Sequence, residues 1–127
     1  MAQDFHDLVV WKKAIELSLC IYKMAGLFPK EEMYGLTSQM RRASVSIASN
    51  IAEGRGRLNV AEFRYFLGLA QGSAFELKTQ LVVAKELGMA NRDILGEADR
   101  LSDEVSKMLR SFIQTLQRKQ LELKAKG

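Results

Sequence analysis

The chain of 127 residues has a single proline, Pro29, and a single cysteine, Cys20. Proline and glycine supply most tight turns between strands, so one proline favours a few long helices over a sheet. One cysteine cannot form an intramolecular disulfide, and the opening residues MAQDFHDL are acidic and lack an apolar segment. We therefore expect a protein of the reducing cytoplasm. No window approaches 18 consecutive apolar residues, so we expect no membrane-spanning helix and no membrane partner.

Residues for metal or covalent chemistry are also scarce. His6 is the only histidine, which leaves no Cys–His pair and no zinc-ligand spacing. Glu97, Asp103 and Glu104 have helical spacing, but the Glu-x-x-His pattern of metal-binding bundles is absent, and a solvated face is the better interpretation. The GRGR stretch at 54–57 lacks the phosphate-loop pattern Gly-x-x-x-x-Gly-Lys. The sequence therefore predicts no catalytic residue, no metal and no cofactor, and a protein that is not an enzyme.

Apolar residues recur with helical spacing in four stretches, at about 8–26, 31–53, 59–87 and 91–120, separated by short loops. The expected N-caps are Asp7, Asn59 and Asn91. The expected helix ends are Gly26, Gly54 and Gly88. The basic tail 117–127 is polar and is expected to fray. The pattern predicts an all-α fold, an antiparallel up-down-up-down four-helix bundle that forms one domain over 1–127.

Apolar residues lie on more than one side of these helices. The first predicted helix should bury Leu8, Trp11, Ile15, Ser18, Tyr22 and Ala25. Off the main faces lie Val9, Val10, Tyr34, Val45, Leu69, Val82 and Val83. A helix that is apolar on two sides buries the second side against something, so we expect a homo-oligomer or another protein contact.

The second predicted helix is unusually polar for a packed element, because it contains Ser44, Ser46, Ser49 and Asn50. One interpretation is a polar ligand groove. The one we favour is close packing of the second and third helices, at which buried hydroxyls find partners. The expected packing residues are Arg42, Ser46, Ser49, Asn50, Glu53, Gly72 and Ser73. Gly68 and Gly72 would each cost a helix about 1 kcal/mol, which a closely approaching neighbour would offset.

Positive charge is concentrated in two segments, although the net charge is only +4. Residues 39–64 carry five arginines against two glutamates, and residues 117–127 carry four basic residues against one glutamate. One hypothesis is a surface for the nucleic-acid backbone formed by Arg41, Arg55, Arg57 and Arg64. The alternative is a protein-interaction scaffold in which these arginines contact subunits or partners. Tyr65 lies off the core face, where it can stack on a base or fill an interface.

Several separated motifs resemble one protein family. They are RRASVSIASNIAEGRGR at 41–57, the spacing Phe5, Leu8 and Trp11, FPKEEMYGL at 28–36 and AQGSAFELKTQL at 70–81. Over roughly residues 5–115 the chain is similar to the four-helix-bundle proteins encoded in intervening sequences of bacterial 23S ribosomal RNA genes. That family includes the accessory variability proteins of diversity-generating retroelements. The chain departs from the family pattern at Ala48, where proline is frequent, and at Lys78, where an acid is frequent.

The resemblance implies a left-handed antiparallel bundle that assembles into a homopentamer with a central channel. Retroelement members bind nucleic acid and a reverse transcriptase through basic surfaces, whereas most other members have no established role. The expected partners are other copies of the chain, RNA or DNA, and a reverse transcriptase if the chain belongs to the retroelement branch. Together with the charge pattern, this predicts a non-enzymatic homo-oligomeric scaffold that binds the nucleic-acid backbone.

Overall fold

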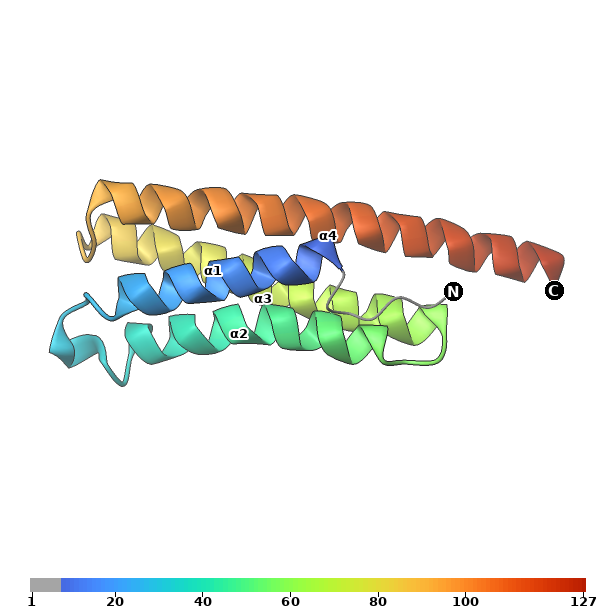
Figure 1. Cartoon of the computed structure of the whole chain (residues 1–127), viewed down its shortest axis with the longest axis horizontal. Coiled ribbons are helices and arrows are strands. Elements are labelled where there is room, and N and C mark those ends of the chain that lie inside the picture. The colour runs from blue at the N-terminus through green and yellow to red at the C-terminus, as the bar shows by residue number, and fades with distance from the viewer. Residues whose placement is uncertain (1–7) are drawn as a thin grey trace.

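The computed structural model describes residues 8–127, and in this part of the chain the structure is helical without strands. Its elements are α1 (Val9–Ala25), a short 3-10 turn η2 (Lys30–Glu32), α2 (Leu36–Arg55), α3 (Val60–Glu86) and α4 (Arg92–Lys126). Successive α-helices run in opposite directions and lie side by side (Figure 1). Helix α1 packs on α2 and α4, and α3 packs on the same two helices, so α3 is diagonal to α1. The predicted four-helix bundle is confirmed.

Local sequence signals explain three of the helix boundaries. The Asn59 side chain accepts a hydrogen bond from the backbone N–H of Glu62 at 2.9 Å, and Asn91 accepts one from Ile94 at 3.0 Å. Both asparagines therefore satisfy an N–H that a first helical turn leaves unpaired. Gly88 follows α3 with a φ of +64°, the left-handed conformation that glycine adopts easily. The predicted N-cap Asp7 lies outside the described residues, and so does the single histidine His6.

Three predicted helix boundaries are wrong. Helix α2 begins at Leu36 instead of residue 31, because Gly35 has φ −107° and ψ −114°, which lies outside the helical region. Gly54 does not end this helix, which continues to Arg55 before Gly56. Helix α4 runs to Lys126 instead of residue 120, since residues 117–126 contain neither glycine nor proline and are mostly good helix formers. The basic tail is therefore helical.

The core lies between all four helices, but α1 is rotated relative to the prediction. Its buried apolar face consists of Val10, Ala14, Leu17, Ile21, Met24 and Ala25. Trp11 and Ile15 are only half-buried, and Tyr22 is 45% exposed. Helix α1 has two overlapping apolar stripes, and periodicity alone does not show which one faces the core. Val10, expected off the core, is buried, whereas the other six residues of that set are exposed.

The serine-rich segment meets α3 through one polar contact. The hydroxyls of Ser46 and Ser73 lie 2.9 Å apart, and the Asn50 amide donates to the carbonyl and the hydroxyl oxygen of Ser46. Ser49 is exposed and takes no part in this contact. The close approach occurs at Gly54, where an added Cβ would lie 2.8 Å from the Cβ of Phe66. At Gly68 and Gly72 an added Cβ would meet nothing within 4 Å, so our expectation of close packing there is wrong.

Candidate nucleic-acid interface

The two basic segments meet at one end of the bundle. The loop between α2 and α3 and the C-terminal part of α4 lie at the same end, and α4 extends beyond the other helices (Figure 1). Arg64 in the first turns of α3 donates a hydrogen bond to the Gln120 side chain at 2.9 Å, which joins the two segments directly. We call residues 53–64 and 118–126 the basic end. They contain seven basic residues and three glutamates.

The opposite end of the bundle has a different charge balance. It is formed by residues 26–35 and 84–93, which contain three basic and four acidic residues. The modest net charge of +4 therefore hides a polarity along the bundle axis. The positive potential is therefore concentrated at one end of the molecule.

Arg57 and Arg64 are held in different ways. Arg57 pairs with Glu53 at 2.6 Å, and its guanidinium lies 4.6 Å from the centre of the Phe66 ring. Its charge is thus partly balanced within the chain. Arg64 is half-buried and its described partner, Gln120, is neutral. This hydrogen bond therefore does not balance the positive charge of Arg64 with an acidic group. Arg55, another arginine of the basic end, is also half-buried.

Arg41 and Arg42 do not join the basic end. Arg41 is separated from Arg55 by fourteen residues of α2, which corresponds to about 21 Å along the axis. Its guanidinium donates to the Tyr22 carbonyl at 3.4 Å and lies 4.9 Å from the Tyr22 ring, so it caps the end of α1. Arg42 is exposed and has no ion pair among residues 8–127, and Glu53 pairs with Arg57 in its own helix.

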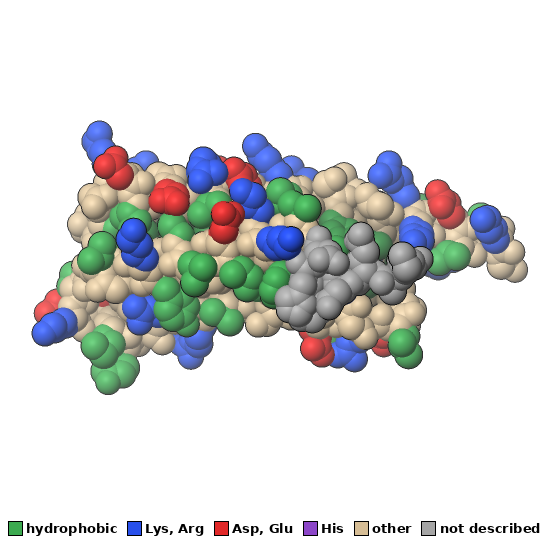
Figure 2. Space-filling view, viewed as in Figure 1, with side chains coloured by type: hydrophobic (Ala, Val, Ile, Leu, Met, Phe, Trp, Pro, Cys, Tyr) green, Lys and Arg blue, Asp and Glu red, His purple; other side chains and the backbone are tan. Residues whose placement is uncertain are grey.

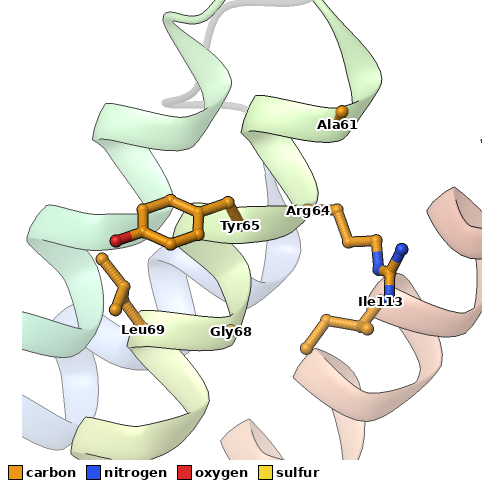
Figure 3. Close-up of a pocket in the computed structure, with 6 residues that line it drawn as sticks. All are labelled: Ala61, Arg64, Tyr65, Gly68, Leu69 and Ile113. Atoms are coloured by element: carbon orange, nitrogen blue, oxygen red, sulfur yellow. The ribbon is translucent and has the colours of Figure 1, made fainter.

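A hollow lies on the surface of α3 at the basic end (Figure 3). Tyr65 and Leu69 stand on one side of it, Arg64 and Ile113 of α4 on the other, and Gly68 lies between them. Its volume is about 460 Å³. The sequence indicated Arg64 and Tyr65 but not Ile113 and Gln120. These two residues lie more than forty positions further along the chain, and no local sequence pattern shows that they contact α3.

Ion pairs join the helices away from the basic end. Lys13 of α1 pairs with Glu104 of α4 at 3.3 Å. The hydrogen bond and charge of Lys13 lower the pKa of Glu104, and the same bond raises the pKa of Lys13. Lys78 of α3 pairs with Asp103 of α4. These pairs therefore link α4 to α1 and to α3 at the surface.

An apolar groove runs between α1 and α2, with a volume of about 410 Å³. Its walls include Trp11, Leu19, Tyr22 and Val45. Leu19 is 67% exposed and Tyr22 is 45% exposed. Hydrophobic side chains gather over this part of the surface in Figure 2. The prediction placed Trp11 and Tyr22 in the core, so it missed this groove.

Cys20 of α1 is half-buried beside the core. Burial raises the pKa of its thiol, and the negative charge of Glu97 raises it further. Across residues 8–127, no three histidine, cysteine, aspartate or glutamate side chains are grouped so that they could hold a metal ion. None of the described helices is long and apolar enough to cross a membrane.

The fold and this surface define an elongated four-helix bundle with a basic end and exposed apolar surfaces. The chain belongs to the 23S rRNA-intervening sequence protein family, whose pattern matches residues 6–111. It is also similar to the crystal structure of a protein of unknown function from the S23 ribosomal protein family of Bacteroides thetaiotaomicron VPI-5482. The two share 25% identity over 84% of this chain and 96% of that chain, with a TM-score of 0.77. A comparison with curated proteins finds no match. The family resemblance seen in the sequence is confirmed.

Proposed function

We propose that this protein is a non-enzymatic homo-oligomeric scaffold that binds the phosphate backbone of RNA or DNA through its basic end. The observation that carries the proposal is the position of residues 53–64 and 118–126 at one end of the bundle, linked by Arg64 and Gln120. Such a surface binds nucleic acid of any base sequence, because each contact with a phosphate releases condensed counterions. Arg55, Arg57 and Arg64 act with the lysines of α4, whereas Arg41 lies too far away to join them.

Charge reversal at either end of the bundle tests this assignment. Lys119→Glu with Lys124→Glu alters the basic end, and Lys30→Glu with Lys85→Glu makes the same change in net charge at the opposite end. All four lysines are exposed. In fluorescence anisotropy with a mixed-sequence probe at low salt, we expect about tenfold or greater weakening for the first pair and a much smaller change for the second. Equal effects of both pairs would mean that only net charge matters.

The proposed self-association rests on two unlike apolar surfaces. One is the groove between α1 and α2. The other is the second half of α3, where Phe75, Val82 and Val83 are between 42% and 53% exposed. A ring of subunits needs two different surfaces that fit each other, whereas a twofold dimer needs one self-complementary surface. Two separate apolar surfaces therefore support the ring that the family resemblance implies, with five subunits.

Light scattering of a groove variant tests this part of the proposal. Leu19→Glu places a charge in the groove, and Leu27→Glu places one on the loop after α1, where the leucine is equally exposed at 65%. We expect the first variant to lower the molar mass toward that of a monomer while helicity is unchanged. The second variant should keep the wild-type mass. A wild-type monomer of 14.3 kDa would contradict self-association.

A protein-interaction scaffold without nucleic-acid binding is the second candidate. The observation that favours it is that Arg41, Arg57 and Arg64 each already contact another residue of the chain. In that case Arg55→Glu with Arg57→Glu would change the oligomeric mass and leave binding to the probe unaltered. Loss of probe binding at constant mass would instead support the first candidate.

A further inference from the structure

The hollow beside Tyr65 contains an exposed aromatic side chain, which a surface that binds only phosphates does not need. We propose that it holds an unpaired base of single-stranded nucleic acid, with the Tyr65 ring as the stacking surface and Arg64 as a donor to the adjacent phosphate. This inference rests on the proposed function and adds the class of nucleic acid and the residues that select it. It goes beyond phosphate attraction, which does not require any base to be unpaired.

Tyr65 is an exposed aromatic ring that contacts a neighbouring ring. Its side chain is 62% exposed on the outer surface of α3. It packs edge-to-face on Phe66, with ring centres 5.3 Å apart and an interplanar angle of 82°. Phe66 in turn carries the Arg57 guanidinium at 4.6 Å. The Tyr65 ring thus packs against a second ring, and that second ring contacts a cation. Single-strand-binding proteins combine these two features.

Arg64 places a cation on the other side of the hollow (Figure 3). Its hydrogen bond to Gln120 at 2.9 Å holds the side chain toward α4 without neutralising it. The guanidinium offers five N–H donors in a planar arrangement that suits phosphate oxygens. A nucleotide that lies across Gly68 would therefore have an aromatic wall on one side and a charged donor on the other.

Gly68 forms the floor of the hollow, and no packing in the described chain requires a glycine there. An added Cβ would meet no atom within 4 Å. Glycine destabilises a helix interior relative to alanine, so an unneeded glycine is unfavourable for the isolated chain. Bare backbone between Tyr65 and Arg64 leaves room for a flat ring. The same surface filled by a side chain would be closed to it.

Charge favours a nucleic-acid strand over a second copy of the chain at this hollow. A second copy that brought its own basic end to this hollow would be repelled by Arg64 and the α4 lysines. A phosphodiester brings negative charge instead. A duplex does not fit the hollow either. Its base faces are already stacked on one another, and only unpaired bases can stack on a tyrosine ring.

The test compares one strand with its own duplex. Tyr65→Ala, Tyr65→Phe and wild-type protein are titrated with a mixed-sequence 20-nucleotide strand and with the same strand annealed to its complement. Stacking on one base corresponds to a factor between about 5 and 150 in affinity. We expect Tyr65→Ala to lose that factor for the strand alone and to bind the duplex as before. Tyr65→Phe keeps the ring and should bind like wild type. Tyr34→Ala, at the opposite end and 92% exposed, is the control.

A second pair of variants tests the floor of the hollow without changing its walls. Gly68→Leu fills the hollow, and Gly96→Leu adds the same side chain at another exposed helical glycine with open space around it. We expect only Gly68→Leu to weaken single-strand binding, with the helical content of both proteins unchanged. Equal binding of the strand by both variants would overturn the assignment of the hollow.

The outcomes separate this inference from the proposed function. If wild-type protein binds neither probe at low salt, the proposed function fails and the inference fails with it. If both probes bind in a salt-dependent way but Tyr65→Ala has no effect, the proposed function stands and the inference is wrong. If Tyr65→Ala instead lowers the molar mass in light scattering, the hollow is a protein contact, which also overturns the inference.

Discussion

Gly54 shows how one residue can be recognised in the sequence for the wrong reason. Its position before an arginine-rich loop suggested a helix end, but the helix continues past it. The space for a side chain is taken by Phe63 and Phe66 of α3, which would lie 3.0 Å and 2.8 Å from an added Cβ. Glycine is needed here for the packing of α2 on α3. No feature of the local sequence distinguishes a packing glycine from a terminal one.

Gly54→Ala is expected to destabilise the bundle by about 1–3 kcal/mol, because the contact atoms include a backbone oxygen and a Cβ that cannot rotate away. Gly72→Ala is the matched control, since open space surrounds that position. The control should gain up to about 1 kcal/mol from helix propensity. Urea denaturation of both variants measures the difference. Equal stability of the two would contradict the packing role of Gly54.

Cys20 should react slowly while the protein is folded. Burial raises the pKa of the thiol above its ordinary value, so less of the reactive thiolate is present at a given pH. We expect slower alkylation by iodoacetamide at pH 8 in buffer than in urea, and a rate that rises with pH beyond the range of an ordinary thiol. An equal rate in both solvents would show that the folded environment does not protect Cys20.

At the scale of elements, α4 combines two roles along its length. Its first part closes the core down to Leu116, the last buried residue of the chain. The remainder extends beyond the other helices (Figure 1). Its residues are mostly polar and basic. Leu, Glu, Lys and Gln are good helix formers, which explains why this segment stays helical where we expected fraying. The helix therefore carries lysines away from the bundle without help from core packing.

Removal of residues 121–127 separates these two roles. We expect a change in the free energy of unfolding within about 0.5 kcal/mol, because the removed side chains are exposed. Nucleic-acid affinity should fall and depend less on salt, because Lys124 and Lys126 are lost. Lys124→Gln with Lys126→Gln in the full chain should reproduce the loss of affinity. A large loss of stability in the shortened chain would mean that the tail supports the core.

The contribution of the ion pair between α1 and α4 to stability should disappear at acidic pH. Lys13 lowers the folded-state pKa of Glu104 below its ordinary 4.5, so the pair stabilises the fold above the unfolded pKa. This contribution is lost as the pH falls through the folded pKa. Glu104→Gln should lower the Tm at pH 7, and its difference from wild type should shrink as the pH drops below 4.5. Glu86→Gln, an exposed glutamate, serves as the control. A difference that is constant with pH would contradict the account.

At the scale of the whole molecule, the sequence predicted the class of fold because its signals are local. The asparagine caps and the apolar faces of α2, α3 and α4 depend on spacing within one helix. The rotation of α1 was not predictable, because two apolar stripes overlap and the choice depends on neighbouring helices. The contact between Arg64 and Gln120 spans 56 positions, so only the topology brings the two basic segments together.

The uneven charge of the molecule is the basis of its proposed function. A net charge of +4 would predict weak and diffuse attraction, whereas seven basic residues at one end offer several phosphate contacts to one strand. Self-association would repeat the basic end in every subunit. Several such ends would then bind one long strand together, with an avidity that a single subunit lacks.

The salt dependence of nucleic-acid binding tests the central claim most directly. Each phosphate contact on a single strand contributes about 0.7 to the slope of log K against log salt concentration. With three to five contacts per chain, we predict a slope of about −2 to −3.5 for the wild type. Lys119→Gln with Lys124→Gln should reduce its magnitude by about 1.4. Absence of binding at about 50 mM salt, or a slope that the two substitutions leave unchanged, would contradict the claim that the basic end binds nucleic acid.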